Sequence, residues 1–192
     1  MINNKNFVRI ISGKYKSRKI IFPDRPGIRP TGSRIRESLF NWIQADIVNS
    51  RCLDLFSGSG ALGIEALSRG AKITTFIESD FETANYLEEN LQTLNAANGI
   101  VVRADAIRWL ESQKNTKPFG FIFLDPPFKN NLLLDCISLL ESNNIISDNG
   151  TIYIETEVDD NLRQLPPTWR LKQKKQAGRV SYCLYKKVDK KG

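Results

Sequence analysis

The stretch Leu53-Asp54-Leu55-Phe56-Ser57-Gly58-Ser59-Gly60 decides the fold of this chain, because it passes from an apolar strand into a glycine loop. A helix is expected next, over 61–69, and Gly63 completes the spacing G-x-G-x-x-G. Glycine lets the backbone turn sharply and lets a ligand approach it closely. Strand, loop and helix in this order are typical of a nucleotide-binding βαβ unit. The simpler interpretation is a strand-to-helix turn that tolerates glycine.

Outward from this stretch, apolar strands and helical patterns alternate, which is typical of a parallel sheet in an α/β protein. At the end of the chain, 169–176 and 180–187 alternate around Ala177-Gly178, and they predict an antiparallel hairpin at one edge. The other expected strands are 51–56, 72–78, 100–103, 119–124 and 150–155, and the other expected helices are 81–95, 105–113 and 130–141.

The start of the chain has a different organisation. Two short strands are expected over 8–11 and 19–22, and a Pro-rich link follows over 23–30. We therefore expect a small basic β-hairpin element over 1–30 and the main domain over 31–192. Apolar residues at helical spacing then predict a helix from Thr31 or Ser33 to Ile47, with Arg34 and Arg36 free to face elsewhere.

Composition limits the chemistry available. The chain has 192 residues, 41% of them hydrophobic, which suits one sizeable core. It contains no His, so imidazole ligation and Ser-His-Asp triads are excluded, and we expect no metal. Cys52, Cys136 and Cys183 lie among apolar neighbours and suggest buried free thiols in a reducing compartment. No apolar run approaches the ~18 residues of a membrane span, so a soluble cytoplasmic protein is expected.

The net charge of +7 is unevenly distributed. Residues 1–36 carry +9 and residues 170–192 carry +8, whereas residues 37–169 carry −10. Basic ends on an acidic body are typical of a phosphate-binding surface built from both termini. The alternative is a solvated surface without a nucleic-acid partner.

A second informative segment, Asp125-Pro126-Pro127-Phe128, follows the apolar strand 119–124. Two prolines turn the backbone carbonyls away from strand pairing. A carboxylate and a carbonyl can then accept both hydrogen bonds of an exocyclic NH₂, and a Phe ring can stack on a flipped-out base. The segment predicts a site that modifies a planar amine, although an ordinary Pro-rich turn would have the same composition.

Acids also lie at the ends of two further strands: Glu78 ends 72–78, and Asp105 follows 100–103. Because the carboxyl ends of parallel strands line one crevice, Asp54, Glu78, Asp105 and Asp125 are expected in one pocket. For each of them a helix N-cap is the alternative, most strongly for Asp105. The glycine spacing also allows NAD, but Asp54 would repel a pyrophosphate and would attract the ammonium and sulfonium of S-adenosylmethionine.

Five segments together give the chain a resemblance to the RsmD family, and the resemblance covers nearly all of it. They are Arg9–Tyr15 through Lys19, Arg29–Thr31, Arg34–Trp42, Asp54–Ala71 and Asp125–Phe128. The resemblance implies an α/β, Rossmann-like class I methyltransferase with a mostly parallel seven-stranded sheet, a C-terminal antiparallel hairpin and a small N-terminal β element that contacts rRNA. It also implies methylation of a guanine N2 in 16S rRNA, at rRNA position 966, by a monomeric enzyme using S-adenosylmethionine. The substrate is expected within a small ribosomal subunit or its assembly intermediate.

On this reading, Asp125, Pro126, Pro127 and Phe128 form the catalytic segment. Asp54 and the glycine loop hold the methionine end of the cofactor, Glu78 the ribose and Asp105 the adenine. The full cofactor set is Asp54, Phe56, Ser57, Gly58, Ser59, Gly60, Glu78, Ser79, Asp105 and Ala106. The expected RNA contacts are Lys14, Lys16, Arg18, Lys19, Arg29, Thr31, Arg34 and Arg36.

Three other functions remain compatible with the residues. A DNA amino-methyltransferase could use the same pocket, although no target-recognition domain is visible. An NAD-dependent oxidoreductase fits the glycine spacing, and a non-catalytic RNA-binding assembly factor fits the basic ends.

Overall fold

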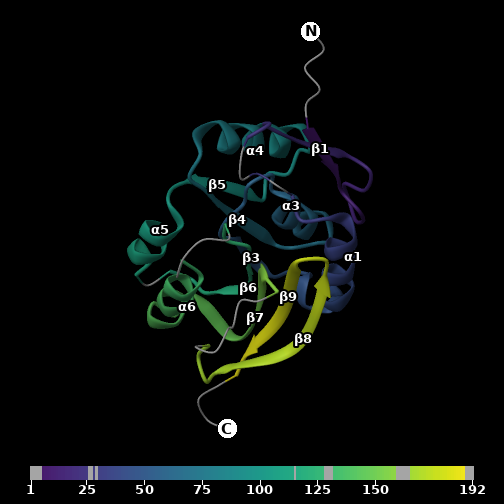
Figure 1. Ribbon diagram of the computed structural model, residues 1–192. Coiled ribbons are helices and arrows are strands. Elements are labelled where there is room, and N and C mark those ends of the chain that lie inside the picture. The colour runs from purple at the N-terminus through teal and green to yellow at the C-terminus, as the bar shows by residue number, and fades with distance from the viewer. Residues whose placement is uncertain are drawn as a thin grey trace.

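The computed structural model describes residues 6–25, 28, 30–114, 116–127, 132–158 and 165–188. Its main sheet has seven strands in the order β5-β4-β3-β6-β7-β9-β8 (Figure 1). The first five are parallel, and β9 and β8 are antiparallel, which confirms the predicted sheet and its terminal hairpin. The strands are β3 (Arg51–Asp54), β4 (Ile73–Glu78), β5 (Gly99–Arg103), β6 (Phe119–Leu124), β7 (Ile146–Glu157), β8 (Trp169–Ala177) and β9 (Val180–Lys187).

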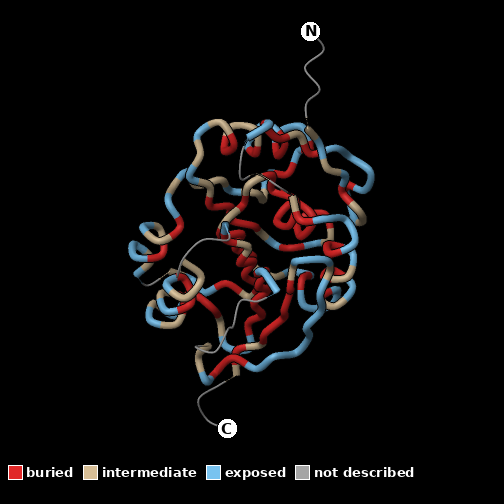
Figure 2. The backbone as a smooth tube through the Cα atoms, in the orientation of Figure 1, coloured by how far each residue is buried: buried red, intermediate tan, exposed pale blue. Residues whose placement is uncertain are grey.

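Helices cover both faces of this sheet, and buried residues concentrate along its central strands (Figures 1 and 2). One buried cluster joins the sheet to α1, α3 and α4, and a second joins its other face to α5 and α6. The helices are α1 (Ser33–Trp42), α2 (Gln44–Ile47), α3 (Ala61–Ser68), α4 (Phe81–Thr93), α5 (Ala106–Ser112) and α6 (Leu132–Ser142).

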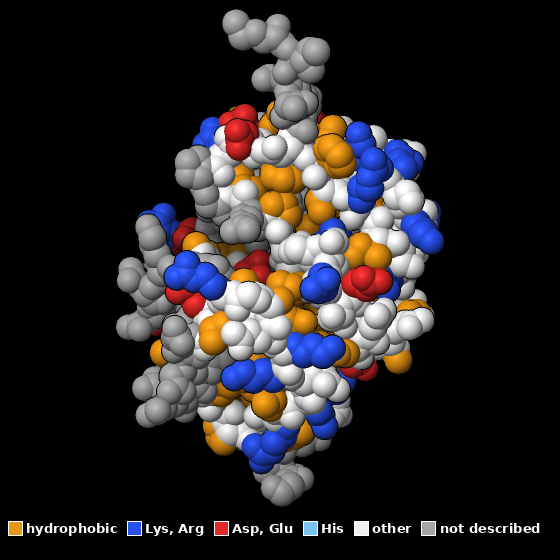
Figure 3. All heavy atoms as spheres, turned by 45° about the vertical axis from the view of Figure 1, so that its right-hand side comes forward, with side chains coloured by type: hydrophobic (Ala, Val, Ile, Leu, Met, Phe, Trp, Pro, Cys, Tyr) orange, Lys and Arg blue, Asp and Glu red, His pale blue; other side chains and the backbone are white. Residues whose placement is uncertain are grey.

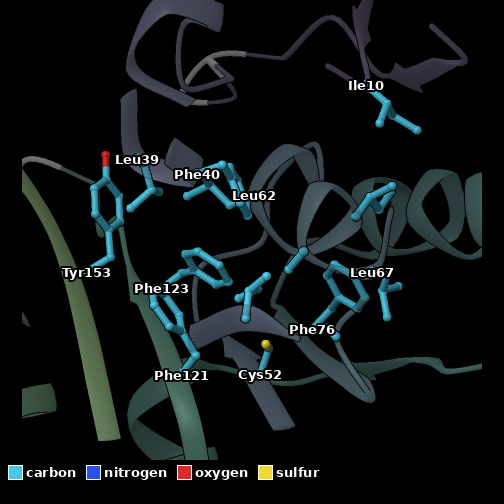
Figure 4. Close-up of a cluster of buried hydrophobic side chains, with 14 of the residues drawn as sticks. Ile10, Leu39, Phe40, Cys52, Leu62, Leu67, Phe76, Phe121, Phe123 and Tyr153 are labelled. Atoms are coloured by element: carbon cyan, nitrogen blue, oxygen red, sulfur yellow. The ribbon is translucent and has the colours of Figure 1, made fainter. Parts of the chain in front are cut away.

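Strand β6 shows why its sequence is apolar at every position except Gly120. Phe121 and Phe123 belong to the first cluster, while Ile122 and Leu124 belong to the second. Figure 4 shows Phe121 and Phe123 below Phe40 of α1, whose ring centroid lies 6.1 Å from that of Phe123. A central parallel strand is buried on both faces, so neither face can be polar.

Several predicted boundaries were wrong. The first strand, expected over 8–11, covers Asn6–Arg9, and the strand expected over 51–56 ends at Asp54. The helix expected up to Ile47 is interrupted at Ile43, where ψ is 12°, and Ile43 and Ile47 are both fully buried around this break. The strand expected at 150–155 begins earlier, at Ile146. There, Asn149 adopts φ 57° inside a bulge of the β6–β7 pairing, so residues with turn chemistry lie within the strand.

The N-terminal residues form a separate two-stranded sheet of β1 (Asn6–Arg9) and β2 (Lys19–Phe22). Its connecting loop is fixed on α3, because the Lys14 N–H donates to the carbonyl of Ser68 at 2.7 Å. A Cβ at Gly13 would lie 1.9 Å from that carbonyl oxygen, so only glycine permits this approach. On the other side, the Asn90 side chain of α4 donates to the Ile21 carbonyl and accepts from the Ile21 N–H.

A buried ion pair also connects these N-terminal residues to helices α1 and α3. Glu65 of α3 accepts from the N–H groups of Ile11 (2.7 Å) and Ser12 (3.0 Å), and from the guanidinium groups of Arg36 (3.4 Å) and Arg69 (2.8 Å). The side chains of Glu65 and Arg36 are 0% and 1% exposed. We name this group the Glu65 cluster.

Three further observations complete the fold. Cys52, Cys136 and Cys183 are buried and free, as predicted. Within the described ranges, no helix has the length and apolar character needed to cross a membrane. Strand β8 forms one edge of the sheet, and its side chains from Arg170 to Gln176 are exposed.

Candidate active site

Four acids lie at one edge of the sheet, where neighbouring parallel strands end. Asp54 ends β3, Glu78 ends β4, Asp105 follows β5 and Asp125 follows β6. Since β5, β4, β3 and β6 are adjacent in this order, the structure brings the four residues to the same edge. Asp54 helps to raise the pKa of Asp125, and Glu78 helps to raise that of Asp54, so neighbouring members of the set interact electrostatically.

Hydrogen bonds within the glycine loop between β3 and α3 fix its backbone conformation. Ser57 donates through Oγ to the Asp54 carbonyl at 2.9 Å, and the Gly60 N–H donates to the Ser57 carbonyl at 2.7 Å. Gly60 has φ 76°, and a Cβ there would lie 2.4 Å from Leu87. Gly58 has φ 48°, yet a Cβ there would meet nothing within 4 Å. The backbone at Gly58 therefore borders open space, as a ligand-binding loop requires.

Asp54 is buried behind this loop. The Gly63 N–H donates to its Oδ2 at 2.9 Å, and burial, as the largest effect, raises the pKa of this carboxyl to about 7. A Cβ at Gly63 would lie 2.2 Å from the Phe76 ring and 2.9 Å from Oδ2. The third glycine thus allows both close packing and the hydrogen bond to Asp54. A buried carboxylate beside an open backbone fits the ammonium end of S-adenosylmethionine.

We expect the affinity for S-adenosylmethionine to fall as the pH decreases below about 7. In that range the Asp54 carboxyl binds a proton in the free protein, and the proton must leave before an ammonium can pair with it. The dissociation constant should rise about tenfold per pH unit between about pH 7 and pH 5. Calorimetry would measure it, with Asp54→Asn as a control that binds weakly at every pH. A flat wild-type profile over this range would contradict the assignment.

The two acids expected to bind the adenosine, Glu78 and Asp105, already accept backbone hydrogen bonds. Glu78 receives the N–H groups of Gly58 and Asp80, both at 2.8 Å, so it fixes the glycine loop. Asp105 caps α5 by accepting from the Arg108 N–H at 3.0 Å. The helix-cap interpretation of Asp105 is therefore realised, and cofactor binding by Asp105 stays a prediction.

The remaining members of the predicted cofactor set lie on or beside these strand ends. Phe56 and Ser59 belong to the glycine loop, where the Ser59 Oγ accepts from the Ala61 N–H at 3.3 Å. Ser79 is exposed directly after β4, and Ala106 is buried at the start of α5. Their contacts with the cofactor stay predictions.

Asp125, the residue expected to bind the target amine, is half-buried directly after β6. Thr31 donates through Oγ1 to its Oδ2 at 3.3 Å. Burial, then the nearby Glu155 carboxylate, raises the pKa of Asp125 well above its ordinary value. Pro126 is buried and Pro127 is exposed, while Phe128 lies outside the described residues.

Sequence reasoning missed Glu155 and gave Thr31 a different role. Leu124 of β6 pairs with Ile154 of β7, so the residues that follow, Asp125 and Glu155, are neighbours. Glu155 is 5% exposed, and its Oε2 accepts from the Tyr153 hydroxyl at 2.8 Å. The strands 119–124 and 150–155 were both predicted. If they had also been expected to pair, Glu155 would have been predicted beside Asp125.

The predicted RNA contacts separate into two groups. Arg36 is buried in the Glu65 cluster, where it also donates to the carbonyls of Thr31 and Arg9, so its prediction as a phosphate contact was wrong. Thr31 contacts Asp125 instead of lying on an outer surface. Arg29 lies outside the described residues. The exposed members of the predicted set are Lys14, Lys16, Arg18, Lys19 and Arg34.

The strand order, the glycine loop and the buried acid behind it define a class I S-adenosylmethionine-dependent methyltransferase. A solved structure of SMU.776 in complex with SAH has the same fold, at a TM-score of 0.69 and 18% identity over 97% of this chain and 57% of that one. A solved structure of yhhF from Escherichia coli matches at a TM-score of 0.89 and 45% identity, over 95% of this chain and 99% of that one.

Comparisons with known sequences identify the family. The model of the family described as conserved hypothetical protein 95 matches residues 8–186. Ribosomal RNA small subunit methyltransferase D of Escherichia coli (strain K12) is 48% identical over 94% of this chain and 90% of its own length. The Haemophilus influenzae protein of the same name is 46% identical over 95% of both chains. The chain therefore belongs to this family, the RsmD methyltransferases.

Proposed function

We propose that this protein transfers a methyl group from S-adenosylmethionine to the exocyclic N2 amine of a guanine in 16S rRNA. By resemblance to the family, the guanine is that at rRNA position 966, in an assembling small subunit in the cytoplasm, and the enzyme acts as a monomer. The observation that supports this most is the neighbouring position of Asp125, with its buried Pro126, and the Asp54 loop at adjacent strand ends. Asp125 and Pro126 suit a planar amine donor, and the Asp54 loop suits a cationic cofactor.

The residues on the amine side position the nucleophile. S-adenosylmethionine, when bound, supplies a methyl group on a sulfonium. The Asp125 carboxylate and the Pro126 carbonyl would accept the two N–H bonds of the guanine amine, which leaves its lone pair directed at the cofactor. Such alignment can contribute up to about 7–11 kcal/mol. The proton released afterwards would pass to Asp125 or to water.

Glu155 should influence the ionisation of Asp125. Because the Glu155 carboxylate helps to raise the pKa of Asp125, Glu155→Gln should lower it. Asp125 accepts amine hydrogen bonds best when ionised, so the acidic limb of the pH–rate profile should move to lower pH. Methyl transfer measured across pH tests this, and Glu157→Gln, at an exposed position of the same strand, serves as the control. An unshifted limb would show that Glu155 does not act through Asp125.

RNA binding by the basic surface should depend steeply on salt. If all five exposed candidates contact phosphates of unpaired RNA, log K should fall with log salt at a slope of about −3.5. Replacing one of them, as in Lys16→Gln, should reduce the slope by about 0.7, whatever the RNA sequence. Titrations at several salt concentrations give both values. Salt-independent affinity would remove these side chains from the interface.

The decisive experiment transfers radiolabelled methyl to small subunits that lack base methylation, alongside free 16S rRNA and duplex DNA. Label on a subunit guanine supports the proposal. Label only on DNA would keep the pocket and replace the substrate. Cofactor binding without any label would favour the non-catalytic assembly factor.

A further inference from the structure

A groove of about 490 Å³ lies between β1 and the start of α1. Its walls include Phe7 and Arg9 of β1 on one side, and Thr31, Gly32 and Ser33 on the other. Thr31 also donates through Oγ1 to Asp125, so one lining residue of the groove contacts this carboxylate. The groove therefore lies between the N-terminal sheet and a residue that contacts the carboxylate expected to bind the target amine.

Phe7, on the wall formed by β1, is an exposed aromatic residue among cations. Its side chain is 47% exposed, and the Lys19 Nζ and the Arg9 guanidinium carbon lie 4.2 and 5.4 Å from its ring centroid. The strand register places Arg9 opposite Lys19, so both charges are fixed beside the ring. Figure 3 shows Lys and Arg side chains gathered at the upper right, over this end of the molecule.

An aromatic ring flanked by cations suits an unpaired nucleotide, whose base stacks and whose phosphate needs positive charge. A cation over an exposed ring contributes about 0.5–1 kcal/mol, whereas base–aromatic stacking contributes about 1–3 kcal/mol. A base can therefore displace Lys19 from the ring and leave its ammonium for the adjoining phosphate. Bases inside a duplex are already stacked and gain nothing from Phe7.

We propose that this groove binds the unpaired RNA segment adjoining the target guanine, with one flanking base stacked on Phe7 and its phosphate held by Arg9 and Lys19. This inference rests on the proposed function, because it assumes that the target guanine binds at Asp125. The groove would then hold the RNA that adjoins this guanine. It makes the site selective for loops and other single-stranded regions.

Fluorescence anisotropy with a short labelled unpaired RNA containing one guanine tests the proposal without methyl transfer. Phe7→Leu keeps the apolar volume but removes the ring, so affinity should fall roughly 5- to 150-fold. Phe7→Trp should restore it. The matched control is Phe81→Leu, since Phe81 is 60% exposed and lies 4.4 Å from the Arg103 guanidinium, but does not line the groove. A duplex RNA should bind Phe7→Leu and wild type equally.

A second variant blocks the groove without touching the ring. Gly32 has φ −57°, and a Cβ there would meet nothing within 4 Å, so the backbone permits Gly32→Phe, which adds a ring at a lining residue of the groove. It should weaken the unpaired RNA at least tenfold while S-adenosylmethionine still binds.

Unchanged affinity in both Phe7→Leu and Gly32→Phe would overturn the proposal. Equal losses on unpaired and duplex RNA in Phe7→Leu would also overturn it, because they would show loss of charge placement and not of stacking. Methylation of small subunits by the wild-type protein is measured separately. A result against RNA binding in the groove is therefore distinguishable from a result against the proposed function.

Discussion

Asp125→Asn should lower kcat for methyl transfer by about 10²–10⁴-fold. The substituted amide presents an NH₂ to an amine that is itself a donor, and it cannot take up the released proton. Single-turnover transfer of labelled methyl to small subunits would measure the loss. Binding of S-adenosylmethionine should persist, because Gly63 and the glycine loop hold Asp54 independently of Asp125.

Asp148→Asn is the matched control for this substitution. Asp148 is exposed on β7, away from the strand ends that form the site, and the same chemical change there should leave the rate unchanged. If Asp125→Asn retained wild-type kcat, positioning by this carboxylate would be refuted even with the methyltransferase activity established.

Glu65→Leu should destabilise the protein by about 3–5 kcal/mol. The substitution removes the acceptor of two backbone N–H groups and leaves the Arg36 guanidinium buried without its carboxylate partner. Burial already lowers the pKa of Arg36, which shows how unfavourable the environment is for an isolated charge. Urea denaturation would measure the effect as a lower midpoint at unchanged m-value.

The matched control is Glu82→Leu. Glu82 forms an ion pair with Arg25 in which both side chains are nearly half exposed, and exposed pairs contribute about 0–1 kcal/mol. Similar costs for the two substitutions would mean that burial of the Glu65 cluster does not determine its contribution.

The centre of the sheet was predictable because its strands, such as β6, are apolar along nearly their whole length, which is typical of strands buried on both faces. Strand 119–124 was located at both ends, and the acids at the ends of the parallel strands followed from topology alone. The predicted start of β7 was wrong because residues typical of a turn lie inside this strand. Asn149 and Gly150 have the composition of a turn, yet they form a bulge whose existence depends on the partner strand.

Side-chain environments at the site were less predictable, since they depend on contacts between distant segments. Arg36 has the same charge as Arg34 two residues earlier, but only packing against α3 buries one and exposes the other. Glu155 became part of the site through the register of β6 and β7. Asp105 had two chemically equivalent interpretations, and the sequence favoured neither strongly.

Among the residues that the structure describes, no strand pairs with the outer side of β8, which leaves one row of its backbone hydrogen-bonding groups at the edge of the sheet. Such an edge can pair with the same strand of another molecule and start aggregation. In this protein the edge carries Arg170, Lys172, Lys174 and Lys175 within nine residues, all of them exposed. Two copies would have to bring these like charges together, so the basic C-terminal region also protects the sheet against self-association at high concentration.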